Sequence, residues 1–134
     1  MNRLSWLEYG MELAKTASLR SEDPFVQVGC CILRPDNSIA SLGYNGGPPN
    51  IDIDWSNRDD RRKRVIHAET NALRFIKPRE ANRMFVTLMP CPDCLKNAAS
   101  YGINQIFYGK AYDFDTSAKD LAQEFRITLQ QLNI

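Results

Sequence analysis

The sequence predicts an α/β fold in which a largely parallel β-sheet is covered by helices on both faces. Short apolar, β-rich runs alternate with segments of helical periodicity along most of the 134 residues. Only a short turn separates the first two β-rich runs, which predicts an antiparallel hairpin. Helical segments separate the later runs, which predicts parallel strands joined by right-handed crossovers.

The N-terminal helix is predicted over residues 3–19, where Leu4, Leu7, Met11 and Ala14 recur on one helical face. It is expected to end before Pro24, because proline disfavours helix in the residue before it. Apolar and β-branched runs, turn residues and helical spacing define the later elements. In order, they are a strand at 26–33, a turn at 34–37, a strand at 38–43, a loop at 44–63, a helix at 65–76, a strand at 84–89, a helix at 92–101, a strand at 105–108, and a helix from about 116 with a weak β-like patch near Ile127.

Length and composition indicate one domain over residues 1–134. The hydrophobic content of 43% and the charged content of 25% are ordinary for a globular protein, and the net charge of +1 provides no field that attracts nucleic acid or an anionic membrane. No apolar run approaches the roughly 20 residues needed to span a bilayer. Charges within the N-terminal helical segment argue against a signal peptide. We therefore expect a cytoplasmic protein without a nucleic-acid or membrane partner.

The four cysteines do not indicate two disulfides. Cys91 and Cys94 have the spacing of metal ligands, whereas Cys30 and Cys31 are adjacent in the first predicted strand. Neighbouring residues of a strand point to opposite faces of the sheet, so we expect Cys30 and Cys31 to be packed thiols and not a bridge. This use of cysteine is typical of a reducing compartment.

Polar and metal-binding residues lie next to the predicted strands at points that the topology brings together. In parallel β-α units, successive helices begin at the sheet edge where the strands end. We therefore expect five separated segments to converge at one edge of the sheet. They contribute Arg20, Asn45, His67, the pair Cys91 and Cys94, and Tyr112.

The motifs His67-Ala68-Glu69 and Pro90-Cys91-Pro92-Asp93-Cys94 predict a catalytic zinc site. One histidine and two thiolates supply three ligands and leave a fourth position open, as catalytic zinc requires. The two cysteines lie at a predicted helix start, where the helix dipole favours thiolates. The pattern H-x-E followed by P-C-x-x-C is the signature of zinc-dependent nucleobase deaminases.

Glu69 is the predicted catalytic residue, because it lies two residues from a ligand without being needed as one. Zinc with an open position lowers the pKa of water to about 7. On a cytosine base the resulting hydroxide would attack C4 while Glu69 protonates N3. Glu69 would then carry a proton to the departing amine, and ammonia would leave.

Two other interpretations of these residues remain open. His67 by itself would more often be a hydrogen-bonded helix histidine, and Cys91 and Cys94 could belong to a structural zinc site completed by Cys30 or Cys31. A structural site has no use for a carboxylate beside the metal, so Glu69 favours catalysis.

The chain resembles the deoxycytidylate (dCMP) deaminase family within the zinc-dependent cytidine deaminase superfamily over nearly its whole length. The matching segments are Arg20-Ser21-Glu22-Asp23-Pro24, Gln27-Val28-Gly29-Cys30, Gly43-Tyr44-Asn45-Gly46, His67-Ala68-Glu69-Thr70-Asn71-Ala72 and Pro90-Cys91-Pro92-Asp93-Cys94. The resemblance implies a three-layer α/β/α cytidine-deaminase-like fold with a mixed five-stranded sheet, in which the first hairpin is antiparallel and the later strands are parallel. It also implies a hydrolase of pyrimidine metabolism that uses Zn²⁺ to convert dCMP to dUMP, a precursor for thymidylate synthesis.

The resemblance assigns further roles to residues of this chain. It implies that Arg20 holds the 5′-phosphate with help from Lys110 and Tyr112, and that Asn45 and Ala68 contact the substrate. A guanidinium suits phosphate, because its fork matches two phosphate oxygens at once. Arg20 as a charged helix end and Asn45 as a turn residue are the structural alternatives. Phe25 stands where the family usually has a small polar residue.

The resemblance also implies regulation and assembly. Family members are commonly homohexamers, activated by dCTP and inhibited by dTTP together with magnesium. Their regulatory pocket lies near the segment that matches Gly43, Tyr44, Asn45 and Gly46. We therefore expect these four residues to couple an effector site to the substrate site.

Several substrates remain compatible with the zinc motif. Cytidine, deoxycytidine, a tRNA adenosine and a pterin-like ring all require the same hydroxide, and Arg20 favours a nucleoside monophosphate among them. A non-catalytic zinc module is the alternative from another class. The charged segment Arg58 to Arg64 is interrupted by Asp59 and Asp60. It is therefore expected to be a solvated loop, or else to contact nucleotide phosphates across a subunit boundary, and not to bind nucleic acid.

Overall fold

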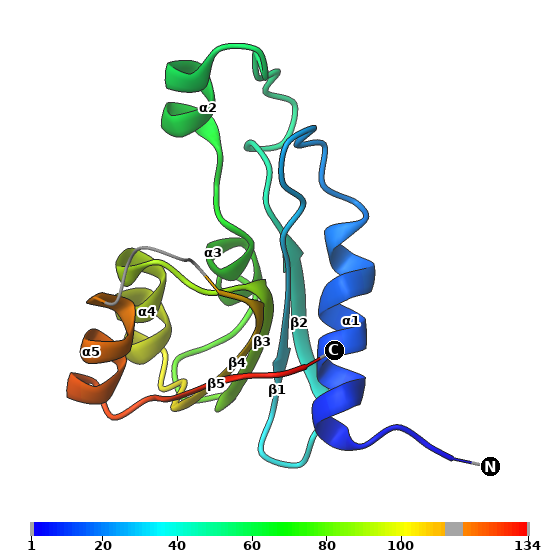
Figure 1. Ribbon diagram of the computed structural model, residues 1–134, viewed down its shortest axis with the longest axis vertical. Coiled ribbons are helices and arrows are strands. Elements are labelled where there is room, and N and C mark those ends of the chain that lie inside the picture. The colour runs from blue at the N-terminus through cyan, green and yellow to red at the C-terminus, as the bar shows by residue number, and fades with distance from the viewer. Residues whose placement is uncertain (1, 112–116, 134) are drawn as a thin grey trace.

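A five-stranded sheet in the order β2-β1-β3-β4-β5 forms the centre of the protein (Figure 1). The structure is a computed structural model that describes residues 2–111 and 117–133. β1 is antiparallel to both of its neighbours, whereas β3, β4 and β5 are parallel to one another, which confirms the predicted mixed sheet. The strands are β1 (Gly29–Leu33), β2 (Ile39–Tyr44), β3 (Arg83–Leu88), β4 (Gln105–Lys110) and β5 (Thr128–Gln131).

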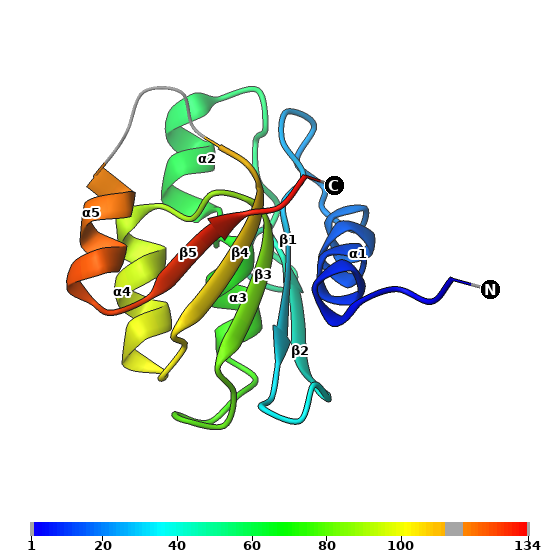
Figure 2. The same ribbon diagram turned by 60° about the horizontal axis from the view of Figure 1, so that its bottom comes forward.

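Helices cover both faces of the sheet and make the predicted three-layer α/β/α arrangement (Figure 2). α1 (Trp6–Ser18) lies on one face. α3 (Ala68–Leu73), α4 (Pro92–Ser100) and α5 (Ser117–Glu124) lie on the other. A short helix, α2 (Arg58–Arg64), lies beyond the ends of the strands, at the top of Figure 1. Among the described residues, no helix has the length and apolarity needed to cross a membrane.

Side chains of the central strands alternate between the two layers of the core. On β1, Cys30 and Ile32 pack in the cluster that contains α3, α4 and α5, whereas Cys31 and Leu33 pack in the cluster that contains α1. The cysteines are free thiols on opposite faces of the sheet, as their adjacency on a strand predicts.

Helix α2 occupies part of the segment that the sequence predicts to be a loop. Asn57 caps it by accepting a hydrogen bond from the backbone N–H of Asp60, and Asp60 pairs with Arg64 one turn later. Acidic residues in its first turn and basic residues in its last turn complement the helix dipole. The helix has no buried residue, so no hydrophobic periodicity marks it in the sequence.

The C-terminal segment contains a strand where the sequence predicts mainly helix. α5 ends in a Schellman motif, in which Ile127 N–H donates to Ala122 O and Arg126 N–H to Gln123 O. Arg126 has a φ of 58°, a left-handed conformation that glycine usually provides. After this turn the chain enters β5 beside β4, so the weak β-like patch near Ile127 marks the fifth strand.

Candidate active site

The predicted metal ligands lie at the N-termini of two neighbouring helices. His67 is the N-cap of α3 and Cys91 is the N-cap of α4, and neither side chain makes a capping hydrogen bond. Cys94 follows in the first turn of α4, after Pro92, which is well suited to the start of a helix. Both helices begin at the same edge of the sheet, so the three side chains meet although 24 residues separate His67 from Cys91.

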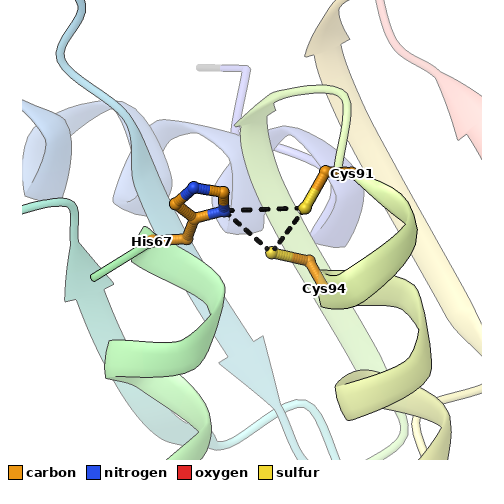
Figure 3. Close-up of side chains that lie close together, drawn as sticks. All are labelled: His67, Cys91 and Cys94. Atoms are coloured by element: carbon orange, nitrogen blue, oxygen red, sulfur yellow. Dashed lines mark hydrogen bonds between the residues drawn. The ribbon is translucent and has the colours of Figure 1, made fainter. Parts of the chain in front are cut away.

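The three ligand atoms form a tight triangle (Figure 3). His67 Nδ1 lies 3.3 Å from Cys94 Sγ and 3.6 Å from Cys91 Sγ, and the two sulfurs are 3.5 Å apart. Tetrahedral zinc, with Zn–S bonds of about 2.3 Å and Zn–N bonds of about 2.0 Å, separates two sulfurs by about 3.8 Å and a sulfur from a nitrogen by about 3.5 Å. The donor set and its spacing therefore fit zinc. Within residues 2–111 and 117–133, this is the one group of three or more potential metal ligands.

The pKa values of the two thiols in this triangle are shifted in opposite directions. A hydrogen bond with Cys94, followed by one with His67, lowers the pKa of Cys91 to about 4. The same contact with Cys91, together with burial, raises the pKa of Cys94 well above its usual range. One thiolate is thus favoured before any metal binds, which suits the capture of a cation.

Glu69 lies in the first turn of α3, is only 4% exposed, and is not part of the ligand triangle. Burial raises the pKa of its carboxyl above the ordinary value. A carboxyl whose pKa is raised toward neutrality is better suited to accept and return protons.

A cavity of about 470 Å³ opens beside these residues. This volume lies in the range of small-molecule sites, roughly 300–1,000 Å³. His67, Ala68, Glu69 and Cys91 line one side of the cavity, and Asn45 lines it as well. Of the predicted substrate-binding residues that the structure describes, Ala68 and Asn45 are therefore the two that lie on the wall of the metal cavity.

Asn45 is buried and its side chain is held by the protein. Its Oδ1 accepts a hydrogen bond from Val28 N–H at 2.8 Å, and its Nδ2 donates to Val26 O at 3.0 Å and to Asp23 Oδ2 at 3.3 Å. These bonds tie the end of β2 to the segment that precedes β1. Asn45 thereby shapes the cavity, in addition to lining it.

Arg20 does not line the metal cavity. It lies in the turn after α1 and lines a second cavity of about 560 Å³. Gly43, Tyr44, Asn45 and Gly46, the predicted effector residues, line this second cavity as well. Asn45 is thus on the wall of both.

Two further predicted residues follow the fourth strand. Lys110 is the exposed last residue of β4 and lines neither cavity. Tyr112 lies outside the described residues. The metal cavity is also lined by three residues that are not among the predicted site residues, namely Phe25, Arg61 and Arg62. The charged segment Arg58 to Arg64 carries the sequence signal for the two arginines, through the alternative expectation that it contacts nucleotide phosphates across a subunit boundary.

The fold has three α/β/α layers. A His-Cys-Cys triangle lies at the N-termini of two helices, and Glu69 lies on the same cavity wall without belonging to the triangle. This combination defines a zinc-dependent hydrolytic deaminase. Comparison with known proteins narrows this class. The family described as "Cytidine and deoxycytidylate deaminase zinc-binding region" matches residues 4–110.

The relatives carry more specific names. A "Deoxycytidylate deaminase" of Homo sapiens is 33% identical over 96% of this chain and 80% of its own length. A "Probable deoxycytidylate deaminase" of Drosophila melanogaster is 35% identical over 78% of this chain, which spans 59% of that protein. The crystal structure of the dCMP deaminase from the cyanophage S-TIM5, in complex with dCMP and dUMP, superimposes with a TM-score of 0.79 at 25% identity, covering 98% of this chain and 100% of the phage chain. The chain belongs to the deoxycytidylate deaminase family.

Proposed function

We propose that this protein hydrolytically deaminates dCMP to dUMP and ammonia, with zinc held by His67, Cys91 and Cys94. The observation that carries this proposal is the ligand triangle, with Glu69 buried beside it on the wall of one cavity. The names of the human and Drosophila relatives and the dCMP complex of the phage enzyme support the choice of substrate. We also assign the enzyme to the cytoplasm, in agreement with the free thiols of Cys30 and Cys31.

Glu69 is the proton carrier of the proposed reaction. Zinc, when bound, supplies activation of water near neutral pH. Glu69 accepts a proton from the attacking water and delivers it to N3 of the cytosine ring while the C4–O bond forms. It then takes the second proton of the original water from the oxygen now bonded to C4 and delivers it to the amine as the C4–N4 bond breaks, so that water and dCMP become dUMP and ammonia.

The second cavity is the proposed effector site. Binding of dCTP as activator or dTTP as inhibitor, each with magnesium, would place a triphosphate close to Arg20 and Arg74, both of which line this cavity. Asn45 lines this cavity and the metal cavity, which supports coupling between the two. We also propose that the protein assembles as a homohexamer. Lys110 and Tyr112 are proposed to help bind the phosphate of the substrate.

Initial rates of the zinc-loaded protein on dCMP, CMP and deoxycytidine test this function, each measured with and without the two triphosphates and magnesium. We expect dCMP to be the preferred substrate, with a rate that dCTP raises and dTTP lowers. Deoxycytidine turned over as fast as dCMP would contradict the nucleotide substrate. Rates on dCMP that do not respond to either triphosphate would contradict the effector site alone.

A further inference from the structure

Arg61 of α2 contributes a positive charge without an acidic partner to the wall of the metal cavity. Among the residues that the structure describes, four ion pairs form, and none includes Arg61 or Arg62. The nearest acid along the helix, Asp60, is occupied by Arg64 and by the backbone N–H of Asp54. The guanidinium of Arg61 therefore remains available to a ligand in the cavity.

The aromatic ring of Phe25, which is itself largely exposed, lies against this guanidinium. The Cζ atom of Arg61 lies 4.1 Å from the centre of the Phe25 ring, within the range of a cation–π contact. A contact with the ring uses none of the five N–H donors of the guanidinium, which stay available for hydrogen bonds. The structure thus orients a planar, charged hydrogen-bond donor at the cavity wall.

Hydrogen bonds to Asp23 fix the backbone that carries Phe25. Asp23 Oδ1 accepts hydrogen bonds from the backbone N–H groups of Phe25 and Val26, at 2.8 and 3.2 Å. Asp23 Oδ2 accepts a hydrogen bond from Asn45 Nδ2, as described above. The loop that carries the aromatic ring is therefore tied to a residue that lines the metal cavity.

The 5′-phosphate of the proposed substrate is negatively charged, so its binding site needs a positively charged hydrogen-bond donor. Zinc with two thiolates and a neutral histidine has no net charge, so the metal site does not attract a phosphate dianion. Arg20 lines the other cavity. We propose that Arg61, oriented by Phe25 and accompanied by Arg62, binds the 5′-phosphate of the substrate and thereby selects a nucleoside monophosphate over a nucleoside. This inference rests on the proposed deamination of dCMP and deepens it.

Equilibrium binding of dCMP and of deoxycytidine tests this role, measured by calorimetry on zinc-loaded protein carrying Glu69→Gln so that no turnover occurs. In that background we expect Arg61→Gln to weaken dCMP binding about 10- to 100-fold, the range for loss of a hydrogen bond to a charged group, and to change deoxycytidine binding far less. Arg58→Gln is the matched control, because Arg58 is on the same helix but does not line the cavity. Its dCMP affinity should equal that of the parent protein.

Two further variants keep the test informative if Arg61→Gln disturbs α2. Arg61→Lys retains the charge but loses the planar fork, and should recover part of the dCMP affinity. Phe25→Leu removes the aromatic face and should weaken dCMP binding, whereas Phe25→Tyr should not.

Unchanged dCMP affinity in both Arg61 variants would overturn the assignment, and a large loss in Arg20→Gln would then return the phosphate to Arg20. Equal affinity of the parent protein for dCMP and deoxycytidine would instead contradict the proposed substrate, so failure of the function and failure of this inference are distinguishable.

Discussion

At the scale of single residues, Asn45 is the side chain that joins the two cavities. It lies on the wall of each, and the hydrogen bonds of its side-chain amide hold Val28, Val26 and Asp23 in place. The Gly-Tyr-Asn-Gly segment contains this residue for a structural reason, in addition to any contact with a nucleotide. A shift of Asn45 in response to a ligand in one cavity would reach the other directly.

Replacement of Asn45 by alanine should therefore destabilise the protein even without substrate. The Val28 N–H would lose its acceptor in a buried place, which costs about 1–3 kcal/mol in the free energy of unfolding. Urea denaturation measures this loss. Asn97→Ala, an exposed change on α4, is the control and should alter stability by less than about 0.5 kcal/mol. Equal stability of the two variants would contradict the structural role of Asn45.

Among the elements of the fold, the close approach of β2 and α3 positions the helix that carries Glu69. A Cβ atom on Gly43 would lie 2.6 Å from Ala68 O and 2.6 Å from Ala72 N, both in the backbone of α3. α3 carries Glu69 and has His67 as its N-cap, so its distance from β2 sets the position of the proposed metal ligand and of the proposed proton carrier. Glycine at this position allows the helix to pack directly on the strand.

Gly43→Ala should push α3 away from the sheet, since backbone atoms cannot move aside as a flexible side chain would. We expect a loss of about 1–3 kcal/mol in stability, together with weaker zinc binding in a chelator competition. Gly46→Ala is the matched control, because nothing lies within 4 Å of its added Cβ. Wild-type zinc affinity in Gly43→Ala would show that α3 does not depend on this contact.

The elements also show how far the sequence predicts the fold. β1 to β4, α1 and α4 follow from apolar runs and periodicity, because each contributes side chains to at least one of the two core layers. α2 buries none, and the turn after α5 has Arg126 at the left-handed position where glycine usually marks the end of a helix. Where burial or turn chemistry leaves no local pattern, the sequence does not locate the element.

The same distinction holds for the site. His67, Glu69, Cys91 and Cys94 are predictable because fixed spacing and helix starts bring them together in any parallel β-α arrangement. Arg61 is not, since its place depends on a stack against Phe25, which is 36 residues earlier in the chain. The hydrogen bonds of Asn45 likewise depend on contacts between loops that no local pattern records.

At the scale of the whole molecule, the sheet direction explains why the site lies where it does. β1 is antiparallel to both β2 and β3, so β2, β3, β4 and β5 all run the same way. Their carboxyl ends therefore share one edge of the sheet, where Asn45, Cys91 and Lys110 follow or end their strands. The start of β1 lies at this edge as well, which brings the segment of Asp23 and Phe25 to the cavity.

We propose that this edge of the sheet holds zinc through His67, Cys91 and Cys94, while Glu69 moves the protons. Zinc content and the dCMP deamination rate, measured together for wild type and Glu69→Gln, test it most directly. We predict one zinc per chain in each protein and a fall in kcat of about 10²- to 10⁴-fold in the variant, the usual contribution of general acid–base catalysis. Near-wild-type turnover by zinc-loaded Glu69→Gln would contradict the role of Glu69 as the proton carrier.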